Sequence, residues 1–142
     1  MSRTAAILVS TIVGAAVLAG CGGQSDYCKA VEKDEASLNT FGQTRTDAAY
    51  KNYAKILENI ATVAPDPISK EWSKLAEATR GVVAAQKAAG VALEEVTPAK
   101  VKDMKPEKKA LLNTAYETFN GTSAQRAAVV KNVKQECKIT LK

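Results

Sequence analysis

The most reactive side chains of this sequence are its three cysteines, because the chain contains no histidine. The lack of histidine excludes Ser-His-Asp and Cys-His catalysis and removes the commonest transition-metal ligand. Cys21 follows a long apolar segment, whereas Cys28 and Cys137 stand near the two ends of the chain that remains. The cysteines therefore divide into one early residue and one distant pair, and each group has its own chemistry.

Residues 1–20, which precede Cys21, have the layout of a secretory signal. Arg3 gives a short basic start, an apolar run extends over residues 5–19, and small residues close it. The run is near the lower length limit for crossing a bilayer, and polar residues such as Ser10 interrupt it. The pattern favours an export signal, and an uncleaved transmembrane anchor is the alternative.

The sequence LAGC at residues 18–21 resembles the lipobox of bacterial lipoproteins. The resemblance implies that diacylglycerol is attached to the Cys21 thiol and that a signal peptidase cuts between Gly20 and Cys21. Two or more acyl chains, such as palmitate, then hold the protein on the membrane, at roughly 0.8 kcal/mol for each buried methylene. We therefore expect a lipoprotein signal peptide over residues 1–20, a tether over 21–25, and a helical domain over 26–142 at the extracytoplasmic face of the cell membrane.

Cys28 and Cys137 remain as a pair once Cys21 carries lipid. Two cysteines in an exported chain indicate a disulfide, here between the first and the last predicted helix. On the chain-entropy model, such a long loop contributes roughly 4–5 kcal/mol to the free energy of unfolding. A redox-active or metal-binding thiol pair is the alternative, but the sequence has no CxxC spacing to support it.

Apolar residues recur at helical spacing through most of the domain, and alanine, lysine and glutamate, which favour helices, are abundant. The pattern predicts five helices, over about residues 26–41, 47–63, 67–89, 106–119 and 123–138. Short loops between them favour a single all-α, up-and-down bundle of four to five helices, closed by the disulfide. Only the short tail at residues 139–141 has the character of a strand.

Two connections between these helices carry specific signals. Asp66 is expected to cap the third helix, with Pro67 in its first position. Residues 91–105 leave two alternatives: a continuation of the third helix, or a short extra helical turn that starts at Thr97 and Pro98.

Trp72, Tyr50 and Tyr53 could floor an apolar ligand pocket between helices, because aromatic side chains supply large apolar surfaces. All three also stand at helical spacing on predicted inner faces, which is typical of core residues. The sequence leaves both interpretations open.

Residues 100–109 form the most highly charged stretch. Five lysines stand there against Asp103 and Glu107: Lys100, Lys102, Lys105, Lys108 and Lys109. A lysine near an anionic surface contributes about 1 kcal/mol, so the stretch could contact anionic lipid headgroups or a wall polymer. The alternative is a solvated loop and helix start.

The net charge of +5 is a mild excess, and Arg3 of the leader supplies one unit of it. Nucleic-acid binding, for which a concentrated basic face is expected, is therefore not indicated. No spacing of side chains indicates a metal or another cofactor.

The mature part resembles small helical lipoproteins of high-GC Gram-positive (actinobacterial) type. Besides the lipobox, the resemblance rests on Tyr27, Cys28, Ala64, Pro65, Ile68, Trp72 and Cys137. It implies an extracytoplasmic helical domain in a family whose members mostly have no assigned activity, and it carries over no catalytic residue.

We therefore expect a non-catalytic binding or interaction module at the cell envelope. Its partners are membrane lipid, through the anchor, and an unidentified protein, lipid or wall polymer. A structural spacer or scaffold is the alternative, and a hydrolase that works without histidine is a further one. A concave cleft near Trp72 would favour a small ligand, and two carboxylates facing each other in a cleft would favour an enzyme.

Overall fold

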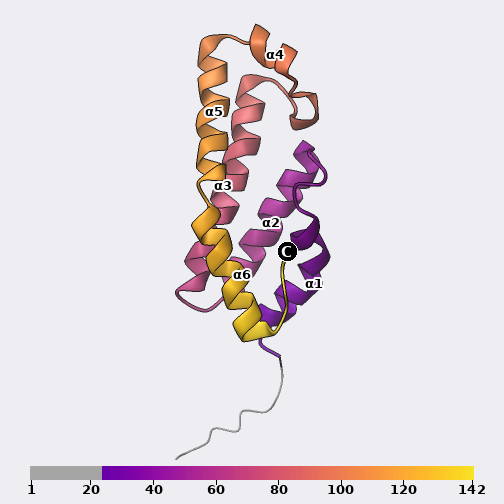
Figure 1. The fold of residues 1–142 in the computed structure, drawn as a ribbon, viewed down its shortest axis with the longest axis vertical. Helices are drawn as coiled ribbons and strands as arrows, with labels where there is room; N and C mark the ends of the chain where they lie inside the picture. The colour runs from indigo at the N-terminus through magenta and orange to yellow at the C-terminus, as the bar shows by residue number, and fades with distance from the viewer. Residues whose placement is uncertain (1–23) are drawn as a thin grey trace, which may run out of the picture.

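Four columns of helix make up residues 24–142, the part of the chain that this computed structural model describes (Figure 1). The end of the bundle that contains Ser25 is called the proximal end here, and the opposite end the distal end. Both lie on the long axis, with the proximal end at the bottom of Figure 1. The predicted signal peptide and Cys21, the predicted lipid attachment site, lie outside the described residues.

Three columns are single helices that alternate in direction. α1 (Asp26–Thr40) leads away from the proximal end, and α2 (Asp47–Val63) returns to it. α3 (Ile68–Ala89) then runs to the distal end, packs along α2, α5 and α6, and meets α1 where Trp72 contacts Tyr27. α3 is therefore the central element of the bundle.

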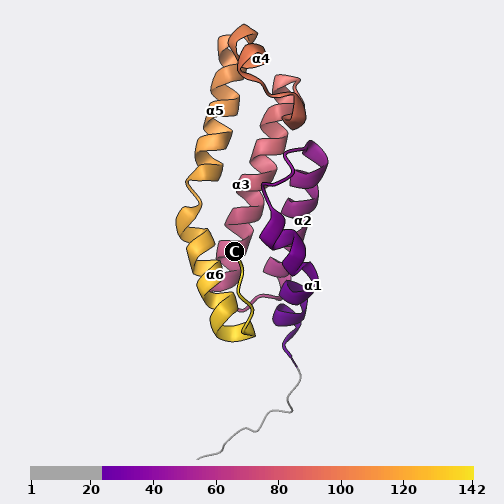
Figure 2. The same cartoon turned by 45° about the vertical axis from the view of Figure 1, so that its right-hand side comes forward.

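The fourth column consists of two helices in succession. At the distal end, the 3-10 turn η1 (Leu93–Glu95) and α4 (Pro98–Asp103) cross over from α3. α5 (Pro106–Asn120) and α6 (Ser123–Cys137) then follow each other back along α3 (Figure 2). The all-α, up-and-down bundle is confirmed, with five helices of 15–22 residues and the six-residue α4 in the described part. No helix within residues 24–142 is both long and apolar enough to cross a membrane.

Helix ends are defined by local hydrogen bonds. The side-chain oxygens of Ser25, Thr46 and Thr97 each accept a hydrogen bond from the backbone N–H three residues later, at 3.2 Å. The extra turn at residues 97–98 is therefore the alternative that the structure adopts. α3 ends at Gly90, whose φ of 74° is the left-handed conformation that glycine adopts without strain.

The predicted cap of α3 is wrong. The helix begins at Ile68, one position later than expected, and no side chain caps it. The Asp66 carboxylate instead accepts a hydrogen bond from the Ser69 hydroxyl at 3.2 Å. Asp66 thus bonds a side chain at the start of the helix and accepts no hydrogen bond from a backbone N–H of its first turn.

A short break at Gly121 separates α5 from α6 without reversing the chain. The Gly121 N–H still bonds to the Glu117 carbonyl oxygen at 2.8 Å, while the Thr122 hydroxyl donates to the Phe119 carbonyl oxygen at 2.7 Å. A Cβ atom at position 121 would lie 3.2 Å from the Glu117 oxygen, which is closer than ordinary contact. Glycine at this position therefore lets the column step sideways and continue along α3.

The main core lies in the proximal half of the bundle. Its most deeply buried apolar side chains come from all four columns, and each is at most 1% exposed: Val31, Leu57, Ile60, Trp72, Ala76 and Val133. The distal half holds smaller clusters, around Val82 and around Ala89. Hydrophobic burial is therefore concentrated near the proximal end.

The disulfide between Cys28 and Cys137 is confirmed, with Cα atoms 5.2 Å apart. It joins the first turn of α1 to the last residue of α6, within the proximal half. Beyond it the tail runs back along the bundle, buries Leu141 and donates the Lys142 N–H to the Asn39 side-chain oxygen at 2.7 Å. The strand character predicted for residues 139–141 is wrong, because this extended segment pairs with no other strand in the described chain.

Replacing both Cys28 and Cys137 by alanine is expected to lower the free energy of unfolding by about 4 kcal/mol. The cross-link closes a loop with a sequence separation of 109, and without it the unfolded chain gains entropy. Chemical denaturation of the oxidised protein and of the double variant measures the difference. Wild-type protein under reducing conditions is the control and should match the variant, whereas equal midpoints for oxidised and reduced protein would contradict the argument.

Candidate functional site

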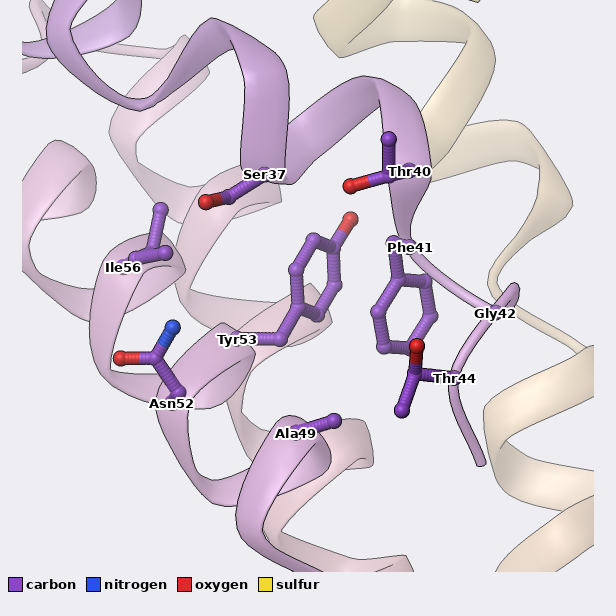
Figure 3. A pocket seen from close by; sticks show the side chains of 9 residues that line it. All are labelled: Ser37, Thr40, Phe41, Gly42, Thr44, Ala49, Asn52, Tyr53 and Ile56. Atoms are coloured by element: carbon purple, nitrogen blue, oxygen red, sulfur yellow. The ribbon is translucent and has the colours of Figure 1, made fainter. Parts of the chain in front are cut away.

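The turn between α1 and α2 brings an aromatic side chain over α2. α1 ends at Thr40, and Gly42 adopts a φ of 88°, which reverses the chain without strain. Phe41 folds back at this point, and its ring stacks on that of Tyr53 with centroids 3.5 Å apart and an interplanar angle of 11°. The stacked pair contributes to the lining of a hollow between α1 and α2 (Figure 3).

This hollow, called the Tyr53 hollow here, has a volume of about 240 Å³. It is lined by Ser37, Thr40, Phe41, Gly42, Thr44, Ala49, Asn52, Tyr53 and Ile56. Five of these residues bring a hydroxyl or an amide, and none of the nine carries a charge. The hollow therefore presents hydrogen-bonding groups in a neutral setting.

The Tyr53 phenol resists ionisation, and its ring is stacked on Phe41. Burial raises the pKa of Tyr53 to about 12, and the positive charge of Arg126 acts in the opposite direction. The phenol therefore stays protonated near neutral pH and can both donate and accept a hydrogen bond. Figure 3 shows its hydroxyl directed toward Ser37 and Thr40 of α1.

Trp72 lies in the core, since it is 1% exposed. Its indole Nε1–H donates to the Tyr27 hydroxyl at 3.2 Å, and that hydroxyl donates to the Asn132 side-chain oxygen at 2.9 Å. The Tyr27 and Trp72 rings meet edge to face, with centroids 6.5 Å apart. Trp72 thus ties α3 to α1 and, through Tyr27, to α6.

The structure does not bring Trp72, Tyr50 and Tyr53 together in one cavity. Tyr50 is buried against Phe41 and Phe119, on the distal side of the core. Tyr53 and Trp72 share a hollow of about 100 Å³, but most of the Trp72 ring is covered by core neighbours. Tyr53 lines the Tyr53 hollow, whereas Trp72 and Tyr50 do not.

The five lysines of residues 100–109 lie at the distal end, around α4 and the start of α5 (Figure 1). Lys108 Nζ donates to the Ala89 carbonyl oxygen at 2.7 Å, and Lys109 Nζ donates to the Lys102 carbonyl oxygen at 2.6 Å. Both carbonyls belong to the last turn of a helix, where an ammonium group is favourable. Two of the five lysines therefore act as caps within the domain.

A hollow of about 370 Å³ lies between these lysines and the end of α3. Lys100, Lys105 and Lys108 line it together with Asp103. Lys100 also pairs with Glu95, at 3.1 Å between Nζ and Oε2, so part of its charge is already balanced. The lysine stretch combines positive charge with groups that hold the distal connection in place.

Two carboxylates, which no motif of the sequence indicates, connect η1 to the start of α2 by hydrogen bonds. The Leu93 N–H donates to Asp47 Oδ1 at 3.0 Å, and the Asp47 N–H donates to Glu94 Oε2 at 3.1 Å. Hydrogen bonds from the backbone N–H groups of Glu94 and Asp47 hold the pKa of the Glu94 carboxyl below its usual value. Both carboxylates accept backbone hydrogen bonds, and neither lines the Tyr53 hollow.

One buried polar side chain lacks a complete set of partners. Gln86 of α3 is fully buried, and its Nε2 donates to the Tyr116 hydroxyl at 2.8 Å. Its Oε1 accepts no hydrogen bond within the described residues. Burial of an unpaired amide oxygen costs free energy, so the Gln86 side chain lowers the stability that the surrounding apolar packing provides.

Comparison with known proteins adds no family to this geometry. No model of a protein family, no curated protein and no solved structure matches the chain. Within residues 24–142, no group of three or more histidine, cysteine, aspartate or glutamate side chains is placed to hold a metal ion. The case for a function therefore rests on the residues themselves.

Tyr53→Phe is expected to remove a tyrosine ionisation near pH 12 from the folded protein. Between the ordinary value of 10.0 and about 12, the unfolded chain ionises at position 53 while the folded chain does not, so the free energy of unfolding falls as pH rises through this range. Ultraviolet titration of the phenols, together with denaturation at several alkaline pH values, measures both effects. If the variant keeps the late ionisation step, another tyrosine is responsible and the burial argument is wrong.

Proposed function

We propose that this chain is a lipoprotein in which lipid on Cys21 holds a non-catalytic binding domain at the extracytoplasmic face of the cell membrane. The observation that carries the anchor is the LAGC sequence at residues 18–21, which ends a segment with the layout of an export signal. Ser25, the cap of α1, follows Cys21 by only four residues. A tether this short keeps the proximal end of the bundle close to the lipid.

The disulfide supports an exported protein, because structural disulfides persist in oxidising compartments and are rare in the cytosol. It also lies at the end of the bundle that the proposed tether would hold. In this arrangement, the proximal core and the covalent link face the membrane. The distal end, with α4 and the lysines, points away from it.

This orientation bears on the partner of the lysines. α3 has 22 residues and spans about 33 Å from one end of the bundle to the other. The Debye length at physiological ionic strength is about 8 Å. If the long axis stands perpendicular to the membrane, the lysines at the distal end are therefore screened from lipid headgroups at the proximal end. An anionic wall polymer or a protein beyond the membrane surface is then the better partner for this end.

The Tyr53 hollow favours a binding module over a spacer. A spacer requires only a packed bundle, whereas this hollow presents four polar side chains next to the stacked pair of Phe41 and Tyr53. The carboxylates that lie near each other, Asp47 and Glu94, serve backbone N–H groups and thus give little support to hydrolysis. We also propose that the chain belongs with the small helical lipoproteins of actinobacterial type that it resembles.

Cys21→Ala is expected to abolish labelling of the protein by radioactive palmitate in cells, because the acylated thiol is gone. Mass spectrometry should find residues 1–20 retained in the variant and removed from the wild type. Gly22→Ala, one residue further on, is the control and should be labelled normally. Equal labelling of wild type and Cys21→Ala would refute the lipid anchor.

A further inference from the structure

The polar side chains of the Tyr53 hollow are largely unused within the protein. The Thr40 hydroxyl donates to the Ala36 carbonyl oxygen at 2.8 Å. The side chains of Ser37, Thr44 and Asn52 make no hydrogen bond to another residue within 24–142, and those of Thr44 and Asn52 are exposed to solvent. Together with the Tyr53 phenol, these groups offer donors and acceptors on several sides of one small space.

The character of the lining restricts the ligand. No side chain among the nine lining residues is charged, so the hollow offers an ionic ligand no compensation for its lost hydration. Ala49, Ile56 and the Phe41–Tyr53 pair add apolar surface between the polar groups. A neutral molecule that alternates hydroxyls with C–H surface matches this mixture.

The size of the hollow and the rigidity of its wall restrict the ligand further. Pockets for drug-sized ligands measure about 300–1,000 Å³, and the Tyr53 hollow, at about 240 Å³, is below that range. The stack on Phe41 holds the Tyr53 ring in place, so little conformational entropy is lost when its hydroxyl binds. The space suits a single ring at the end or along the edge of a longer molecule.

From this geometry we infer that the Tyr53 hollow binds one neutral sugar ring of a glycan. The inference deepens the proposed function and rests on it only for the source of the glycan, which would be the cell envelope. The polar side chains would bond the ring hydroxyls, and the apolar surface would contact its C–H groups. A contact limited to one ring implies weak affinity for single sugars and a gain when an envelope polymer presents many copies.

The test is titration calorimetry with saturation-transfer NMR on the full-length protein, extracted in a detergent without a sugar headgroup. The probes are three neutral trisaccharides: chitotriose, maltotriose and cellotriose. Glucose 6-phosphate and glucuronate serve as charged sugars, and N-acetyl-alanine amide as a neutral ligand that is not a sugar. At least one neutral trisaccharide is expected to bind saturably, and the charged sugars and the amide at least tenfold more weakly.

Two variants connect such binding to this site. Asn52→Ala removes an exposed amide from the lining, and Tyr53→Phe removes the hydroxyl while keeping the aromatic stack. Each is expected to weaken binding about tenfold, which is the effect of losing one well-placed hydrogen bond. Asn59→Ala is the matched control, because Asn59 is exposed on the same helix and does not line the hollow. Circular dichroism checks that all three variants fold.

Three results overturn the inference: no binding by any neutral trisaccharide, equal binding by charged sugars or the amide, or binding that Asn52→Ala and Tyr53→Phe leave unchanged. None of them touches the lipid anchor, because binding is measured on extracted protein. Conversely, loss of the anchor hypothesis in the palmitate experiment would leave the sugar measurement valid.

Discussion

The hydrogen-bond chain from Trp72 through Tyr27 to Asn132 holds the proximal half of the bundle in register. It links α3 to α1 and α6, and it lies among the most deeply buried side chains of the domain. An indole N–H buried without a partner would cost free energy, so the position of Trp72 depends on that of Tyr27. The disulfide from Cys28, the residue after Tyr27, joins α1 and α6 covalently. Tyr27 and Trp72 belong to the main core, which packs around this point.

The two halves of the molecule are held by different forces. Apolar side chains from four columns meet in the proximal half. In the distal half, α5 packs against α3, and Leu112 is its one buried residue. Polar contacts also hold α4 and η1 in place there. These contacts are the hydrogen bonds of Asp47 and Glu94 and those of the capping lysines. Because surface hydrogen bonds and ion pairs contribute less than core burial, we expect the distal half to open more readily.

Features that depend on neighbours along the chain could be predicted from the sequence. The range of α2 agrees with the predicted 47–63, because a threonine cap precedes it and Pro65 follows it. The cysteine pair could be assigned since only two thiols remained after Cys21. Features that depend on distant neighbours could not be predicted in this way. The stack of Phe41 on Tyr53 depends on the path of the turn, and the caps by Lys108 and Lys109 depend on how α5 meets α3 and α4. The sequence offered two signals for the hollow: Tyr53, already a candidate pocket residue, and the aromatic Phe41 just before Gly42.

The position of the disulfide determines how the domain carries mechanical tension. A pull on the chain before Ser25 reaches Cys28 within the first turn of α1 and passes through the sulfur atoms directly into α6. Peeling α1 away from the body therefore requires rupture of a covalent bond rather than stepwise loss of helical turns. A load applied at the distal end has no such protection, because the disulfide lies at the other end of the bundle. At the distal end, η1 and α4 are attached by hydrogen bonds, an ion pair and the smaller apolar clusters, one of which buries Leu93. Under force, the molecule would unfold first at its distal end, while its proximal end stays folded.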